Sequence, residues 1–205
     1  MSDPALHGDT PPYRPDFLPR RVILFSGHMV DAPGRKHARF PPERVSAAGS
    51  RIEAALAEIG AGRGDLALTQ GAAGGDLLFA EACVGRGVSV RLLLPLPEDD
   101  FVARSILPSH DGKAWYRRYR QLEPLLAGPP LAAPDVLGPL TAGDDAFERG
   151  NRWLLASALA CGADKLRFIC LWDGGGGDGP GGTRHMIEAV EARGGEVLRI
   201  DTRTL

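Results

Sequence analysis

Three apolar segments of the sequence each end in glycine and polar residues, the residue types that hold a phosphate or a sugar. The segments are residues 21–26, 66–69 and 166–172. Glycine lets a backbone approach a ligand closely, and a helix that follows offers free N–H groups and a positive dipole end. The residues at these ends that we predict to bind a ligand are Gly27, His28, Asp31, Gly71, Ala72, Gly74, Gly75, Asp76, Trp172, Asp173, Gly181, Gly182 and Thr183. Pro95, after a fourth apolar segment, and Asn151, at the start of a helix, complete the set.

Three of the polar side chains are candidates for catalysis. Asp76 or Glu81 would stabilise an oxocarbenium-like ribosyl centre or activate a water, and His28 would assist a leaving base. The alternatives are structural: Asp76 as a helix cap, Glu81 on a solvated helix face, and His28 as a hydrogen-bonded loop residue. No HExxH motif and no Cys/His cluster is present, so we predict neither a metal nor a cofactor. The absence of Gly-x-Ser-x-Gly disfavours acyl transfer.

Residues 66–94 show which elements must position these side chains. An apolar run, a glycine-rich elbow from Gly71 to Asp76, a helical run and a second apolar run follow one another in about thirty residues, the minimum size of a βαβ unit. Helical and strand patterns alternate along the rest of the chain without hairpin signals. We therefore predict an α/β fold, a three-layer Rossmann-like sandwich with a mainly parallel central sheet whose strand ends meet at one edge.

The domain organisation is simple. Residues 1–20 contain five prolines and little apolar content, and we predict a flexible proline-rich tail. Residues 21–205 form a single domain with no visible repeat. Residues 128–143 are rich in proline and poorly periodic, which predicts a long surface loop.

Composition and charge exclude several functional classes. The chain has 205 residues, 43% of them hydrophobic and 24% charged, with a net charge of -2. This balance does not suggest a nucleic-acid or anionic-membrane surface. The three cysteines form no CxxC pair, no apolar stretch approaches the ~20 residues of a membrane span, and no signal pattern opens the sequence. We predict a cytoplasmic location, with no membrane or nucleic-acid partner.

The elbow resembles the SLOG superfamily, the Rossmann-like group that contains the LOG phosphoribohydrolases, the DNA-processing protein DprA and bacterial nucleotide-sensing domains. The similarity lies in the turn from Gly71 to Asp76, in Ala80 and Ala82 on the helix after it, and in the strand that ends at Pro95. The Gly27-His28-x-x-Asp31 pattern and the late Pro180-Gly181-Gly182-Thr183 pattern are also similar to members of this group. The resemblance implies a Rossmann-like fold, a nucleotide-like small-molecule ligand and a homodimer formed through helices beside the sheet.

The sequence departs from the LOG enzymes at their catalytic residues. Those enzymes carry PGG-x-GT-x-x-E, whereas here the second glycine is missing and Glu188 lies five positions after Thr183. The elbow helix also has no arginine before Arg86. We therefore predict a domain that binds or senses a nucleotide or an ADP-ribose-like nucleotide sugar. The alternatives are an N-glycosidic enzyme, such as a phosphoribohydrolase or a deoxyribosyltransferase-like protein, and a non-catalytic interaction module that uses residues 108–145.

Overall fold

The computed structural model describes residues 11–175 and 183–205, and these form one six-stranded sheet between two layers of helices. Every paired strand is parallel, and the order across the sheet is β4-β3-β2-β1-β5-β6. The strands are β1 (Val22–Gly27), β2 (Leu66–Thr69), β3 (Ser89–Leu94), β4 (Leu131–Ala132), β5 (Leu166–Trp172) and β6 (Glu196–Asp201). This arrangement confirms the predicted Rossmann-like α/β fold.

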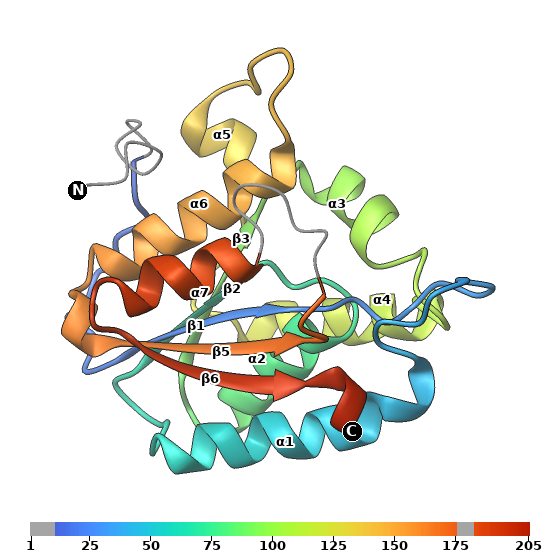
Figure 1. Cartoon of the computed structure of the whole chain (residues 1–205). Helices are drawn as coiled ribbons and strands as arrows, with labels where there is room; N and C mark the ends of the chain where they lie inside the picture. Colours follow the sequence, from blue (N-terminus) through green and yellow to red (C-terminus); the bar gives the residue numbers. More distant parts are fainter. Residues whose placement is uncertain (1–10, 176–182) are drawn as a thin grey trace.

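The central strands are apolar on both faces because helices cover both sides of the sheet. All four residues of β2 and the first four of β1 are buried. The helices are α1 (Val45–Glu58), α2 (Gly75–Gly85), α3 (Glu98–Ser105), α4 (Gly112–Leu122), α5 (Ala133–Leu137), α6 (Ala146–Leu159) and α7 (Thr183–Glu191). Helices α1, α2 and α4 lie on one face, and α6 and α7 lie on the other (Figure 1).

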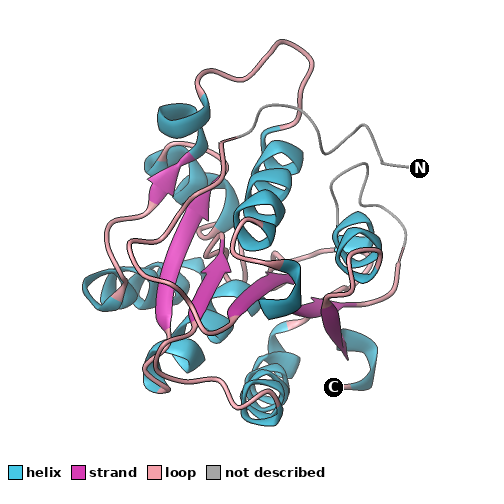
Figure 2. Cartoon of the chain, turned by 90° about the vertical axis from the view of Figure 1, so that its left-hand side faces the viewer, coloured by secondary structure: helices cyan, strands magenta, loops and turns pink. Residues whose placement is uncertain are grey.

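Each face of the sheet has its own hydrophobic core. In the core between the sheet and helices α1 and α2, the rings of Phe25 on β1 and Phe79 on α2 stack with their centroids 4.7 Å apart. In the core between the sheet and helices α6 and α7, Trp153 on α6 and Phe168 on β5 are fully buried. The edge-on view in Figure 2 shows the strands between these two helical layers. Helices are thus fixed on both sides of the sheet, and the loops at its carboxyl edge are held between them.

The second core also includes part of the segment that we predicted to be a flexible tail. The backbone N–H of Tyr13 donates to Ser157 Oγ at 2.9 Å, and Trp153 Nε1–H donates to the carbonyl of Pro11 at 3.2 Å. The Tyr13 and Phe17 side chains pack on this core. Pro11 and Tyr13 are therefore held against α6, whereas Arg20 at the end of this segment pairs with Asp65. Residues 1–10 lie outside the described part of the chain.

The predicted loop over residues 128–143 contains two short elements. Strand β4 pairs with the end of β3, and α5 follows it directly with a proline in its first turn. Helix α5 ends at Gly138, where φ is +78°. Elements of two and five residues are shorter than the window in which periodicity can be recognised, so the sequence pattern missed them.

Strand β1 lies at the point where the order of strands changes direction. The chain first proceeds outward from β1 through β2 and β3 to β4, and then returns to place β5 on the other side of β1. Open parallel sheets bind ligands beyond the carboxyl ends of their strands at such a point. Within residues 11–175 and 183–205, no helix has the length and apolar character needed to cross a membrane.

Candidate functional site

A cavity of about 390 Å³ opens beyond the carboxyl end of β1. Its walls come from the end of β1 and the loop after it, the elbow, residues 105–109, α6 and the start of α7. Seven of the residues that we predicted to bind a ligand line it: Gly27, His28, Asp31, Ala72, Asp76, Asn151 and Thr183. Residues from all three glycine-ended strands or the loops after them therefore meet around one cavity, as the parallel-sheet prediction required.

Asp76 is a buried residue in the wall of this cavity, and it also holds the elbow together. Its Oδ2 atom accepts hydrogen bonds from the backbone N–H groups of Gly71 at 3.1 Å and Ala72 at 3.3 Å. Burial raises the pKa of the carboxyl to about 6, although the N–H groups of Ala72 and Gly71 and the Thr69 side chain oppose this shift. Asp76 therefore stabilises the turn and also titrates close to neutral pH.

His28 connects the loop after β1 to the loop after β5. Its Nδ1 atom lies 2.7 Å from Arg39 Nη2, and its Nε2 atom lies 3.1 Å from Asp173 Oδ1. Burial alone would raise the pKa of Asp173, but hydrogen bonds from the Gly175 N–H and from His28 hold that pKa below its ordinary value. Asp173 itself does not line the cavity, so it acts on the site through His28.

Asp31 lines the cavity and closes the loop of residues 31–40. Its Oδ2 atom accepts from the backbone N–H groups of Arg39 at 2.9 Å and Phe40 at 3.0 Å, and its own N–H donates to the Phe40 carbonyl. Its Oδ1 atom lies 3.3 Å from Arg35 Nε. Both hydrogen bonds to this carboxylate are therefore accepted by Oδ2, whereas Oδ1 makes only the ion pair with Arg35 among the described residues.

The glycines of the elbow, which we predicted to bind a ligand, do not line the cavity. Gly74 has φ +112°, and a Cβ there would lie 2.7 Å from the Val30 nitrogen. A Cβ on Gly75 would lie 3.1 Å from side-chain atoms of Leu171 and Phe25. Gly71 has φ +92°. These positions require glycine because backbone segments and buried side chains pack closely there.

Other predicted residues lie away from the cavity. Pro95 packs against α6, where a Cβ on Gly150 would lie 2.8 Å from the Pro95 Cβ. The Trp172 ring packs on the second core, and the Arg184 guanidinium makes a cation–π contact 5.6 Å from the ring centroid. The Glu81 carboxylate forms a two-point ion pair with Arg118 on α4 and does not line the cavity. Gly181 and Gly182 lie outside the described residues.

The walls also contain polar residues that the sequence analysis did not select. They are Ser26, Arg35, Arg39, Gln70, Ser105 and Ser109. Gln70 Nε2 donates to Asn151 Oδ1 at 2.8 Å, and the hydroxyls of Ser26 and Thr183 are 3.2 Å apart. Of these residues, only the two arginines belong to a recognisable sequence feature, the basic cluster of residues 35–39 in the loop after the first strand.

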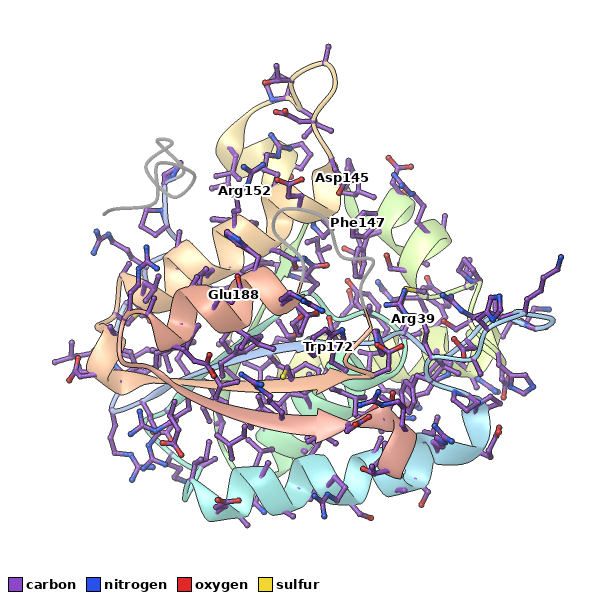
Figure 3. The ribbon with its side chains drawn as sticks, viewed as in Figure 1. Arg39, Asp145, Phe147, Arg152, Trp172 and Glu188 are labelled. Atoms are coloured by element: carbon purple, nitrogen blue, oxygen red, sulfur yellow. The ribbon has the colours of Figure 1, made fainter. Side chains whose placement is uncertain are left out.

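An aromatic side chain also contributes to the wall of the cavity. Phe147, near the start of α6, lines the cavity, and the Arg104 guanidinium lies 5.1 Å from its ring centroid. Figure 3 shows Arg39 beside the carboxyl ends of the strands and Phe147 at the adjacent end of α6. The cavity thus combines cationic, amide, hydroxyl and apolar groups. Within the described chain, no group of three or more His, Cys, Asp or Glu side chains is placed to hold a metal ion.

Comparison with known proteins gives a likeness at the level of the fold. No family model matches the sequence, and no curated protein matches it. Among solved structures, the chain is similar to DNA processing protein A (DprA) from Streptococcus pneumoniae, with 12% identity and a TM-score of 0.44. The match covers 88% of this chain and 50% of that one, so the chain spans half the length of the solved protein.

Proposed function

We propose that this protein binds a nucleotide or an ADP-ribose-like nucleotide sugar in the cavity beyond β1. The observation that carries the proposal is that His28, Asp76 and Thr183, from the segments after three adjacent strands, line one cavity of about 390 Å³. That volume lies within the usual range for small-molecule sites, roughly 300–1,000 Å³. The position at the reversal of strand order is where parallel α/β sheets bind ligands.

The groups in the cavity match the parts of a nucleotide. The Gln70 and Asn151 amides and the Ser26 and Thr183 hydroxyls can pair with ribose hydroxyls or base edges. Phe147 and Leu154 offer apolar surface to a base. This mixture of a few polar groups with apolar walls is typical of sites that fix the orientation of a small ligand.

Thermal unfolding with a panel of ligands tests the proposal. The panel contains AMP, ADP-ribose, cyclic ADP-ribose, NAD and cyclic nucleotides. A ligand at about 100 times its Kd stabilises the folded state by about 2.7 kcal/mol, which raises the Tm of a domain of this size by roughly 5–10 °C. If no member of the panel raises the Tm at saturating concentration, the proposal is wrong.

Two substitutions on α6 locate the binding event. Asn151→Ala removes an amide from the cavity wall and should reduce the ligand-induced shift. Arg152→Ala is the matched control, because Arg152 is the next residue on the helix, pairs with Glu148 and does not line the cavity. Equal effects of the two substitutions would place the ligand elsewhere.

One observation favours a second candidate function, hydrolysis of an N-glycosidic bond. Asp76 lines the cavity, and burial raises the pKa of its carboxyl to about 6. A carboxylate that titrates near neutrality is suited to take a proton from a water molecule. The water oxygen would bond to the anomeric carbon, the C–N bond would break with its electrons passing to the base, and the base would take up a proton.

Base release from nucleoside monophosphates tests this second candidate. Wild-type protein should release free base, and Asp76→Asn should lower the rate by a factor of about 100 or more, a typical contribution of a general base. A wild-type protein that binds nucleotides without releasing base is a binding protein only. Equal rates for wild type and Asp76→Asn would remove Asp76 from the mechanism.

A further inference from the structure

We propose that Arg35 and Arg39, on the loop after β1, bind a terminal phosphate of the ligand. Anion recognition would then reside in this basic loop and not in the glycine-rich elbow. The inference rests on the proposed nucleotide-binding function, and it identifies the ligand as a phosphate monoester.

The elbow is poorly suited to hold a phosphate because four of its six backbone N–H groups are already occupied. The N–H groups of Gly71 and Ala72 donate to the Asp76 carboxylate. The Ala73 N–H donates to the Ser105 carbonyl at 2.9 Å, and the Gly75 N–H donates to the His28 carbonyl at 3.2 Å. A phosphate at this turn would have to replace bonds that hold the elbow and the loop after β1 together.

The loop of residues 31–40 instead places cationic side chains at the cavity, and hydrogen bonds between its two ends hold the loop in position. The Asp31 carboxylate joins the two ends of the loop because it accepts hydrogen bonds from the backbone N–H groups of Arg39 and Phe40. Both Arg35 and Arg39 line the cavity, and Arg35 also pairs with Asp31 Oδ1 at 3.3 Å through its Nε atom. Arg39 forms no ion pair with a carboxylate within the described chain, and its guanidinium instead contacts His28. A guanidinium presents several N–H donors in a plane, which suits two-point binding of a phosphate.

The wall contributed by residues 105–109 supplies a second, independent observation. Ser105 and Ser109 line the same cavity with exposed fractions of 1% and 3%, and within the described chain neither hydroxyl has a hydrogen-bond partner. A buried polar group without a partner costs about 1–3 kcal/mol, so such groups in a cavity wall indicate a missing acceptor or donor. Phosphate oxygens would accept from both hydroxyls while the two arginines balance their charge.

Isothermal titration with AMP, adenosine and inorganic phosphate tests this assignment. Wild-type protein should bind AMP at least about tenfold more tightly than adenosine, because charge-assisted hydrogen bonds contribute about 1.5–3 kcal/mol each. The double substitution Arg35→Gln with Arg39→Gln should lower the AMP affinity about 100-fold and leave the adenosine affinity unchanged. Ser109→Ala, which leaves the loop intact, should lower the AMP affinity about threefold or more.

The control is Lys36→Gln in the same loop. Lys36 is exposed and does not line the cavity, so its loss removes a positive charge without removing a contact. AMP affinity should then change less than about threefold, as expected for an exposed charge. Thermal unfolding of each variant confirms that it is folded.

The outcomes separate this inference from the proposed function. Equal wild-type affinities for AMP and adenosine would overturn the phosphate assignment and leave nucleoside binding intact. The assignment is equally overturned if the double substitution weakens AMP and adenosine alike, or if Lys36→Gln matches its effect. Binding of inorganic phosphate alone, lost in the double substitution, would support the phosphate site and refute nucleotide binding. No binding of any of the three compounds refutes the phosphate assignment, whereas the proposed function is refuted only if the whole ligand panel also fails to raise the Tm.

Discussion

The elbow and the loop after β1 follow neighbouring strands at the same edge of the sheet, yet they use their polar groups in opposite ways. The elbow directs four of its backbone N–H groups to Asp76 and to the carbonyls of Ser105 and His28. The loop closes on itself through Asp31 and places Arg35 and Arg39 at the cavity. A glycine-rich turn is therefore not by itself a ligand site, and the deciding question is whether its donors are already paired.

The two regions are mechanically connected. Met29 and Gly74 form an antiparallel bridge, and the Val30 N–H donates to the Ala73 carbonyl at 3.0 Å. The Gly75 N–H returns a bond to the His28 carbonyl. The backbone of the elbow thus holds the loop after β1 in position, and the side chains of that loop line the cavity. Four substitutions test this division, from the largest expected effect to the smallest.

Gly74→Ala should cause the largest loss of stability. The residue has φ +112°, and the added Cβ would lie 2.7 Å from the Val30 nitrogen and 3.0 Å from the His28 carbonyl oxygen. Backbone strain and the steric clash together should lower the free energy of unfolding by about 4 kcal/mol. Urea unfolding measures this change. A loss below about 1 kcal/mol would show that the elbow and the loop are not in rigid contact.

The pH dependence of stability tests the role of Asp76 in the elbow. Burial raises its pKa from 3.8 to about 6 in the folded protein, so between these values the folded state binds more protons than the unfolded chain. The stability contributed by the protonated group is therefore lost as the pH rises, by about 2 kcal/mol between pH 4.5 and 7.5. Wild-type stability relative to Asp76→Asn should fall by this amount across that interval, as measured by urea unfolding. Parallel pH profiles for the two proteins would contradict the raised pKa.

The fold could be predicted from the sequence because its main signals are local. The apolar runs of β1, β2 and β5 are buried on both faces, and their alternation with helices is enough to predict a parallel sheet. Parallel strands also place their carboxyl ends at one edge, which is why His28, Asp76 and Thr183 could be grouped in advance. These inferences required only the order of elements along the chain.

The details of the site depend on contacts between distant segments, which no local pattern encodes. The need for glycine at position 74 arises from the backbone at Val30, more than forty residues earlier in the chain. Ser105 and Ser109 follow α3 in sequence and reach the cavity only through the tertiary fold. Arg35 and Arg39 were visible as a basic cluster, but their direction is set by the bonds from Asp31 to the far end of the loop.

Asp31→Ala should separate the effect of the loop from the effect of the elbow. The substitution leaves the N–H groups of Arg39 and Phe40 without their acceptor, which should lower the free energy of unfolding by about 2 kcal/mol. The loop that carries the arginines would then no longer be held closed. AMP affinity should fall by about tenfold, because the loop would have to become ordered when AMP binds. Calorimetric titration measures this change. Unchanged affinity would show that closure of the loop does not position the arginines.

Gly34→Ala should have the smallest effect, and it is the matched comparison for Gly74→Ala. Gly34 also has a positive φ, +78°, but a Cβ there would meet no atom within 4 Å. The substitution therefore adds backbone strain without a steric clash, and the free energy of unfolding should fall by only about 1 kcal/mol. The difference between the two glycine variants in urea unfolding isolates the contact between the elbow and the loop. If Gly34→Ala is as damaging as Gly74→Ala, backbone conformation alone explains both losses, and the elbow does not support the loop in the way that the structure indicates.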